Sequence, residues 1–309
     1  MISTIQMRFL DKVKGPVFPI PTPFLENGDI DFSGLENYVK FLVRNGAQTL
    51  LVTVGTSRFS VLTIDEMKRV NQTVVESADE KCMVIVASPD SGPTKQAIAF
   101  ARHAQSIGAD GILAVYPDRY YNDDHIFQYF EDIANACRIG VLIHNHSIKG
   151  GSGRAGSSVN LSPQFFERIS EIDNIVGMKE ETHNTQLIYE YNRVLRDKFC
   201  VIGGAGVMKA FYVAHQWGQP AYLVGIGNFL PVIELSFYQK IKSNDYTAAK
   251  NIFFEKEDQF LKIAVEVGWH LALKEAMAVK GLMSAWERPP MERLSPEDRK
   301  RVVQLISKE

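Results

Sequence analysis

Short apolar runs alternate along the chain with longer stretches in which apolar residues recur at helical spacing. Runs of four to six apolar residues are typical of strands that are buried on both faces. Between the runs, sets such as Leu35, Val39 and Leu42 mark one face of a helix. We predict strands at residues 16–19, 49–54, 83–87, 111–115, 140–143, 175–178, 199–202 and 221–224.

This alternation gives eight strand–helix units before about residue 243. Near-continuously apolar strands separated by helices indicate a parallel sheet. Eight such units are best closed as an α/β (β/α)8 TIM barrel, which takes about 250 residues. An open doubly wound sheet is the alternative, but its usual Gly-x-Gly-x-x-Gly does not follow the first strand, where residues 22–28 read Thr-Pro-Phe-Leu-Glu-Asn-Gly.

Beyond residue 245 the apolar runs stop, and residues 247–265, 269–281 and 296–308 read as three amphipathic helices. No Pro/Gly/Ser-rich or low-complexity linker precedes them. We therefore predict a barrel over residues 1–243 that carries the active site, and a C-terminal helical extension over residues 244–309 that caps it.

Charge and cysteine content narrow the possible partners and surroundings. The chain has 34 Lys and Arg against 36 Asp and Glu, a formal net charge of -2, which gives no general attraction to nucleic acid or to an anionic membrane. Its three cysteines are far apart in sequence, which argues against disulfides and structural zinc. The N-terminus lacks a secretory apolar stretch, and residues 221–235 are too interrupted to span a bilayer. We expect a cytoplasmic protein without nucleic-acid or membrane partners.

In a barrel of this kind the active site lies at the carboxyl ends of the strands. The apolar run at 175–178 is followed directly by Lys179. Burial disfavours the charged form of an amine, and a neutral amine can attack a ketone to form a Schiff base. The alternative is a lysine whose charged end simply reaches solvent from the end of a strand.

Strand five ends in His144 and His146, whose alternation with Asn145 places both rings on one face. No cysteine or carboxylate lies near them in sequence to complete a metal site, so an acid–base role for His144 is favoured. A metal-dependent barrel hydrolase or aldolase that uses both histidines remains an alternative.

Further polar or glycine-containing segments follow the other strands, and each also has an ordinary structural interpretation as a turn, a packing residue or a solvated side chain. Hydroxyls and an arginine can bind a carboxylate, phenols can relay protons, and glycines bring the backbone close to a ligand. The candidates are Thr56 and Ser57 after strand two, Tyr120 and Tyr121 after strand four, Arg154 in the loop after strand five, Gly204 after strand seven, and Gly225 and Ile226 after strand eight.

Four short motifs resemble those of one enzyme family. They are Pro-Ile-Pro-Thr-Pro-Phe at 19–24, Gly-Met-Lys-Glu at 177–180, Gly-Ile-Gly-Asn-Phe-Leu-Pro at 225–231 and Arg-Pro-Pro at 288–290. Together they resemble the dihydrodipicolinate synthase / N-acetylneuraminate lyase family of class I aldolases. The resemblance extends over nearly the whole chain and identifies it as a divergent member.

The resemblance implies that Lys179 forms a Schiff base with pyruvate or a related 2-oxo acid, which is then joined to an aldehyde or released from one, without cofactor or metal. It also implies a homo-oligomer, either dimer or tetramer. Thr56 would serve catalysis and substrate binding, Tyr121 would belong to a proton relay in a neighbouring subunit, and Ser57, Arg154, Gly204, Gly225 and Ile226 would bind substrate.

The chain departs from the family pattern at positions that matter for chemistry. His144 stands where the family has an acid–base tyrosine, Arg58-Phe59 replaces a Gly-Glu pair, and Asp118-Arg119 is inserted before Tyr120. A phenol and an imidazole differ in pKa by about 3 to 4 units, so they do not transfer protons identically at neutral pH. We expect His144 to take the tyrosine's role with an altered aldehyde partner. Dihydrodipicolinate synthase itself, and a non-catalytic protein that only binds a 2-oxo acid, are the alternatives.

Overall fold

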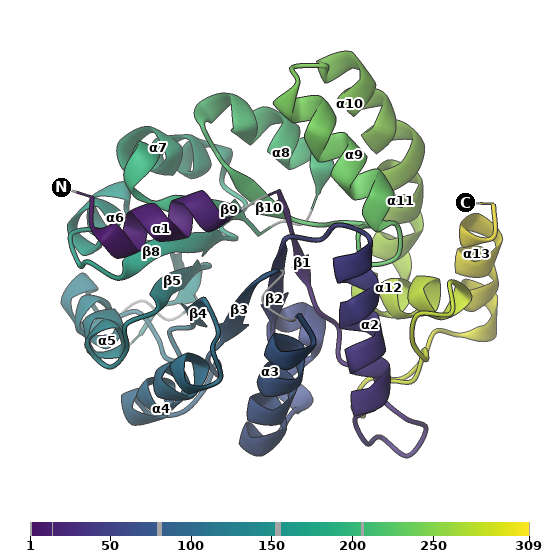
Figure 1. Cartoon of the computed structure of the whole chain (residues 1–309), viewed down its shortest axis with the longest axis horizontal. Coiled ribbons are helices and arrows are strands. Elements are labelled where there is room, and N and C mark those ends of the chain that lie inside the picture. Colours follow the sequence, from purple (N-terminus) through teal and green to yellow (C-terminus); the bar gives the residue numbers. More distant parts are fainter. Residues whose placement is uncertain (1, 14, 79–81, 152–155, 205–206, 309) are drawn as a thin grey trace.

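The computed structural model describes residues 2–13, 15–78, 82–151, 156–204 and 207–308. Eight parallel strands close into a barrel in the order β1-β10-β9-β8-β5-β4-β3-β2 (Figure 1). The strands are β1 (Pro16–Pro19), β2 (Thr49–Val52), β3 (Met83–Ala87), β4 (Gly111–Ala114), β5 (Gly140–Asn145), β8 (Ile175–Glu180), β9 (Cys200–Gly203) and β10 (Ala221–Leu223). The predicted (β/α)8 barrel with a C-terminal helical extension is confirmed.

In the described parts of the chain, each barrel strand is followed by a helix that packs on its outer surface (Figure 1). Side-chain caps begin several of them; Asp31, for example, accepts a hydrogen bond from the Gly34 amide at the start of α2. The helices are α2 (Phe32–Arg44), α3 (Ile64–Ala78), α4 (Thr94–Ser106), α5 (Asp123–Asn135), α6 (Pro163–Ile169), α7 (Thr185–Leu195), α8 (Met208–Ala214) and α9 (Pro231–Lys242).

Alternation along the strands produces two separate apolar cores. Side chains that point outward, such as Val84 and Ile112, pack against the helices, whereas inward ones, such as Leu51, Leu142 and Val176, fill the barrel. The barrel interior is therefore packed, and a site can form only where polar side chains replace apolar ones at the mouth.

An N-terminal helix that the sequence analysis did not predict closes the amino end of the barrel. Figure 1 shows α1 (Thr4–Lys12) lying across the barrel beside β8 and β5. Its Phe9 joins the inner core, and a Cβ atom added to Gly140 would lie 2.8 Å from the Phe9 ring. Closure of this end leaves the carboxyl end of the barrel for chemistry.

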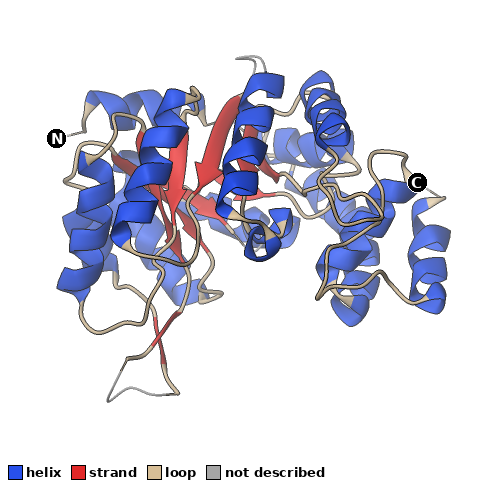
Figure 2. Cartoon of the chain, turned by 90° about the horizontal axis from the view of Figure 1, so that it is seen from below, coloured by secondary structure: helices blue, strands red, loops and turns tan. Residues whose placement is uncertain are grey.

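The C-terminal helices gather at the side of the barrel away from the N-terminus (Figure 2). They are α10 (Tyr246–Ile252), a π-helical turn (Phe253–Glu257), α11 (Asp258–Val267), α12 (Trp269–Val279) and α13 (Pro296–Ile306). The predicted helix over 247–265 is present as the contiguous α10, π-helical turn and α11; the π-helical turn within it was not predicted. The division of the chain at residue 243 stays a prediction.

Strand ends at the barrel mouth differ from those predicted. β2 stops at Val52 because Thr53 has a φ of 57°, in the left-handed region. β5 and β8 instead run two residues further than predicted, so Lys179 lies within its strand and not after it. After β5 a short hairpin, β6 (Ile148–Lys149) with β7 (Ser158–Val159), was also missed.

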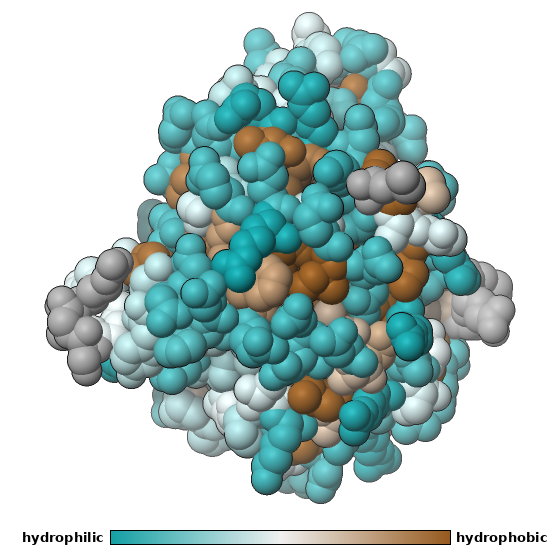
Figure 3. All heavy atoms as spheres, turned by 90° about the vertical axis from the view of Figure 1, so that its left-hand side faces the viewer, coloured by the Kyte–Doolittle hydropathy of each residue, from teal (hydrophilic) through white to brown (hydrophobic). Residues whose placement is uncertain are grey.

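The outer surface is mainly hydrophilic on the face shown in Figure 3, with apolar side chains gathered into small patches. No helix within the described ranges is both long and apolar enough to cross a membrane.

Candidate active site

A β-bulge aims Lys179 into the barrel mouth. Ile175 points outward and Val176 inward, so strict alternation would turn Lys179 outward. The register between β5 and β8 shifts at Val141/Leu142, and beyond the shift Met178 points outward while Lys179 lies beside His144. The shift passes through Gly177, where a Cβ atom would lie 2.4 Å from the Cys200 carbonyl oxygen. Glycine at 177 thus permits the bulge that directs the lysine inward.

Lys179 forms a compact cluster with His144 and Glu181. Its Nζ donates a short hydrogen bond to Glu181 Oε2 and lies 3.1 Å from His144 Nε2. His144 Nε2 lies 2.6 Å from the same carboxylate oxygen, and the Lys179 side chain is only 6% exposed. One carboxylate oxygen therefore holds both the amine and the imidazole.

The protonation states of this cluster follow from burial and mutual charge. Burial, reinforced by the positive charge of Lys179, lowers the pKa of His144 to about 4. Burial raises the pKa of Glu181, but its hydrogen bond to His144 and the charge of Lys179 outweigh burial and lower it to about 2. At neutral pH the imidazole is neutral and the carboxylate ionised, so Nε2 carries the hydrogen that is donated to Glu181.

A cavity of about 510 Å³ opens above Lys179. Its inner wall comes from the barrel mouth and its outer wall from the C-terminal helices. It is lined by Pro19, Val54, Gly55, Thr56, Phe59, His144, Lys179, Glu181, Gly204, Val207, Lys209, Leu223, Val224, Leu261, Val265, Trp269 and His270. The C-terminal extension therefore forms part of the wall around Lys179.

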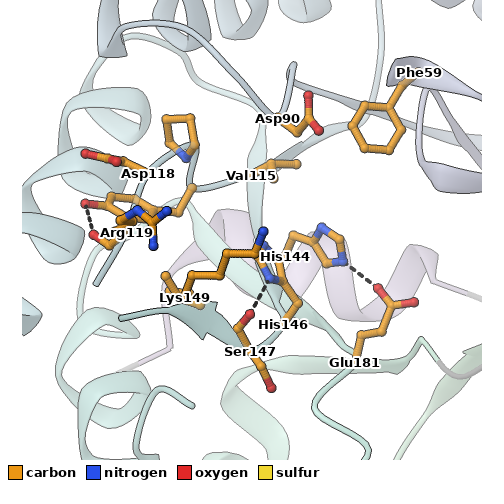
Figure 4. A pocket seen from close by; sticks show the side chains of 13 residues that line it. Phe59, Asp90, Val115, Asp118, Arg119, His144, His146, Ser147, Lys149 and Glu181 are labelled. Carbon is orange, nitrogen blue, oxygen red and sulfur yellow. Dashed lines mark hydrogen bonds and ion pairs between the residues drawn. The ribbon is translucent and has the colours of Figure 1, made fainter. Parts of the chain in front are cut away.

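A second cavity, of about 550 Å³, lies on the other side of the His144–Glu181 pair (Figure 4). The two cavities share Phe59, His144 and Glu181. The second is more polar, and its charged or hydrogen-bonding side chains include Asp90, Tyr116, Asp118, Arg119, His146, Ser147 and Lys149. The His144 and His146 rings lie 4.8 Å apart between centroids, on the same side of the chain as their alternation predicts.

Of the two predicted hydroxyl residues after β2, Thr56 faces the Lys179 cavity. The Ser57 hydroxyl is fully buried, donates to the Ile20 carbonyl at 2.6 Å and accepts from the Val54 amide at 3.2 Å. Ser57 therefore fixes the turn that carries Thr56, and its role in substrate binding stays a prediction.

The predicted substrate-binding positions Gly204, Gly225 and Ile226 also differ in whether they line the Lys179 cavity. Gly204 lines the Lys179 cavity, and its amide donates to the Glu180 carbonyl at 2.6 Å. The Ile226 amide donates to Glu234 at 3.2 Å, and the Gly225 amide also bonds that carboxylate. Among the described residues that line the cavity, this loop is represented by Val224, so binding by Gly225 or Ile226 stays a prediction.

The tyrosines after β4 do not reach Lys179 within one chain. Tyr121 is 48% exposed and packs against Gly151, where a Cβ atom would lie 2.5 Å from its ring. The Tyr120 hydroxyl donates to Asp123 at 2.9 Å. Arg154, the predicted carboxylate-binding residue of the following loop, lies outside the described residues.

Glu181 and the apolar wall were missed by sequence reasoning. Glu181 follows Lys179 by two residues, and that spacing places both on one face if the chain stays extended. The sequence analysis did not use this spacing. Within the described ranges, no three His, Cys, Asp or Glu side chains are grouped closely enough to hold a metal ion.

Comparison with known proteins agrees with this architecture. A 4-hydroxy-tetrahydrodipicolinate synthase from Aquifex aeolicus is 27% identical over 299 residues, covering 96% of this chain and 97% of the relative. A probable 5-dehydro-4-deoxyglucarate dehydratase from Pseudomonas savastanoi is 25% identical, with 94% of each chain covered.

Solved structures extend the likeness to the fold. The crystal structure of dihydrodipicolinate synthase from Aquifex aeolicus matches with a TM-score of 0.85 at 25% identity, over 96% of this chain and 98% of that one. CdNal from Clostridium difficile, solved with mannosamine, gives the same TM-score at 20% identity, over 96% and 99% of the two chains. The model of the dihydrodipicolinate synthetase family matches residues 12–309. The chain therefore belongs to the dihydrodipicolinate synthetase family and has the fold of its aldolases and lyases.

Proposed function

We propose that this protein is a class I, Schiff-base-forming aldolase or lyase whose Lys179 condenses with pyruvate or a related 2-oxo acid. The observation that carries the proposal is a nearly buried lysine amine at the base of a cavity, 3.1 Å from a histidine and bonded to a carboxylate. Amine, acid–base group and space for a substrate are the parts that imine chemistry requires.

The reaction follows from these parts. The neutral amine attacks the C2 carbonyl carbon of the 2-oxo acid, and proton transfers with loss of one water give the imine. Loss of a proton from C3 gives an enamine, whose C3 attacks the carbonyl carbon of an aldehyde while the aldehyde oxygen takes up a proton. Water then hydrolyses the imine, releasing the joined product and restoring the amine. The reverse sequence cleaves the same bond.

His144 is the proton carrier in this proposal. With its Nε2 hydrogen donated to Glu181, the neutral imidazole can accept a proton at Nδ1 and return it from there, and Nε2 lies 3.1 Å from the reacting nitrogen. Glu181 fixes the imidazole through Nε2 and offsets the positive charge that develops on it. Thr56 lies across the cavity, where its hydroxyl would bind the carboxylate of the 2-oxo acid.

The relatives support the reaction class and leave the aldehyde open. The two curated relatives are named as a synthase and a dehydratase, so a shared lysine chemistry with different second steps is consistent with both. A homo-oligomer, with Tyr121 reaching a neighbouring subunit, and a cytoplasmic location belong to the same proposal. The exposure of Tyr121 in the single chain is consistent with such a contact.

Reductive trapping tests the proposal directly. Borohydride added with pyruvate should attach a reduced pyruvyl group to Lys179, located by peptide mass spectrometry. Lys179→Ala should abolish the label. Lys209→Gln removes the other lysine that lines the same cavity and should leave the label intact.

The alternatives predict different outcomes. A label on Lys179 without consumption or release of any aldehyde would favour a non-catalytic 2-oxo-acid-binding protein. Product formation from pyruvate with aspartate semialdehyde in a coupled assay would favour dihydrodipicolinate synthase itself. If pyruvate and a panel of other 2-oxo acids all fail to label Lys179, the proposed chemistry is wrong.

A further inference from the structure

We infer that the outer half of the Lys179 cavity selects an aldehyde with an apolar substituent. The inference rests on the proposed function and names the substrate class of the same site. It is carried by an apolar stripe on the C-terminal helices (Leu261, Val265 and Trp269) that lines this cavity.

We place the aldehyde in the cavity that contains Lys179. The new carbon–carbon bond forms at C3 of the enamine, one bond from the imine carbon on Nζ, so both partners share one space. Lys179 lines the 510 Å³ cavity and is not among the residues of the second cavity. Ligand pockets of roughly 300–1,000 Å³ hold drug-sized molecules, so a three-carbon acid near Thr56 leaves the outer half for its partner.

The wall of that outer half is a stripe along one face of α11 that continues into α12. Leu261 and Val265 are one turn apart, and Trp269 begins the next helix. The core-facing residues of α11 are instead Phe260 and Ala264, which are 2% and 0% exposed. The stripe is therefore a second apolar face, which lines the cavity.

Val265 is the exposed member of this stripe: it is 77% exposed, more than any other large apolar side chain among the described residues. Leu261 and Trp269 are partly buried, pack against the core and line the cavity with their remaining surface. Three apolar side chains that converge on a cavity with a reactive lysine indicate a binding surface.

The outer half offers few hydrogen-bond partners to a hydroxylated chain. Outside the Lys179 cluster and Thr56, the described side chains that line the cavity and carry hydrogen-bonding groups are Lys209, His270 and the indole N–H of Trp269. Lys209 is already paired with Asp258 at 3.3 Å. A sugar-like aldehyde would therefore lose water from its hydroxyls without replacement, whereas an alkyl or aryl group would only lose contact with water.

The expected selectivity can be set from transfer energies. Each methylene that leaves water for the stripe should raise kcat/KM about fourfold. Each hydroxyl that loses water without a new partner should lower kcat/KM about fivefold or more. An apolar C4 to C6 aldehyde should therefore exceed a tetrose such as erythrose by well over a hundredfold.

The test uses the full chain with pyruvate and the aldehydes propanal, butanal, hexanal and erythrose, with product quantified by mass spectrometry. Leu261→Asn combined with Val265→Thr makes the stripe polar and keeps the buried Phe260 and Ala264, and thermal unfolding checks that loss of the Leu261 contact with the core has not disturbed the fold. This variant should lose about tenfold or more in kcat/KM for hexanal and little for erythrose, with unchanged borohydride labelling by pyruvate. Val232→Thr, at a 60% exposed position on α9 outside the cavity, is the matched control and should change neither.

The possible failures are distinguishable. Intact labelling with erythrose used as well as hexanal overturns the apolar site but leaves the Schiff base standing. If the variant loses kcat/KM equally for both aldehydes, the stripe serves folding and the inference is overturned. If light scattering shows a changed oligomeric state while the selectivity is unchanged, the stripe contacts a second copy of the chain, which also overturns the inference. Absence of labelling in the unaltered protein overturns both proposals.

Discussion

Replacement of Glu181 by glutamine removes one charge from the Lys179 cluster and little else. The carboxylate oxygen Oε2 accepts from both Lys179 and His144, and glutamine keeps the shape while losing the ionic part of each bond. Hydrogen bonds to charged groups contribute about 1.5–3 kcal/mol and neutral ones about 1 kcal/mol. Each bond therefore weakens by about 0.5–2 kcal/mol.

The expected kinetic effect depends on which of these bonds limits turnover. If Glu181 acts by holding His144, a loss of about 0.5–2 kcal/mol lowers kcat about 2- to 30-fold. Removal of the imidazole itself, as in His144→Gln, should cost the full contribution of acid–base catalysis, about 10²- to 10⁴-fold. Both variants keep the Lys179 amine, so pyruvate and borohydride should still label each of them.

The pH profile of kcat/KM distinguishes a role of Glu181 in positioning His144 from general damage to the structure. Because the pKa of His144 is lowered to about 4, kcat/KM should show no histidine limb between pH 5.5 and 8, whereas an ordinary imidazole would titrate near 6.5. The Glu181 carboxylate holds the pKa of His144 higher than burial alone would, so the glutamine variant should move any acidic limb to still lower pH.

The assay is steady-state turnover of the best aldehyde, with labelling and circular dichroism as checks on the fold. Asp90→Asn makes the same carboxylate-to-amide change in the neighbouring cavity and should leave kcat unchanged. Unchanged kcat in Glu181→Gln, or a wild-type limb near pH 6.5, would refute the reasoning.

Three further changes test other parts of the structure. Gly177→Ala places a Cβ atom 2.4 Å from the Cys200 carbonyl, so it should lower the melting temperature and abolish labelling of Lys179. Burial, with the charge of Glu234, raises the pKa of Glu257 to about 9, so between pH 5 and 9 the folded state binds more protons than the unfolded state. The free energy of unfolding should therefore decrease as the pH rises through this range, by up to about 1.4 kcal/mol per pH unit. Glu257→Gln should flatten this slope in urea titrations. Arg58→Gly relieves a φ of 59° but removes the ion-pair partner of the buried Glu287 carboxylate, which keeps only the nearby charge of Lys274, so unfolding experiments should show a net loss of stability that adding Glu287→Gln partly restores.

The sequence predicted the barrel because its signal is local. Each strand is an apolar run that must be buried on both faces, and eight such runs leave few arrangements. The elements that were missed depend on contacts distant in sequence. The π-helical turn ends at Glu257, whose carboxylate accepts hydrogen bonds from the Met208 amide, 49 residues away. No periodicity within residues 247–265 could have indicated that contact.

The sequence indicated the candidate residues that lie at strand ends, but it did not indicate which way their side chains point. His144 and Lys179 were both identified, since each lies at the mouth of its strand. The β-bulge that turns Lys179 inward could not be predicted, because it depends on the fit of Gly177 against Cys200 of the neighbouring strand. Ser57 carries a hydroxyl of the kind expected to bind a carboxylate, and in the structure this hydroxyl donates to the Ile20 carbonyl and holds a turn.

Two departures from the family pattern, Phe59 and His144, lie close together in the structure. The resemblance implies a glutamate where this chain has Phe59 and a tyrosine where it has His144, so two proton-handling groups appear to be lost when the sequence is compared site by site. Phe59 lies beside His144 and Glu181 at the junction of the two cavities. Glu181, which directly follows β8, places a carboxylate at this junction. Its hydrogen bond with the neutral His144 imidazole leaves the second ring nitrogen available as a proton acceptor. In the proposed mechanism His144 and Glu181 therefore handle protons together beside Lys179, where the resemblance implies a tyrosine and a glutamate.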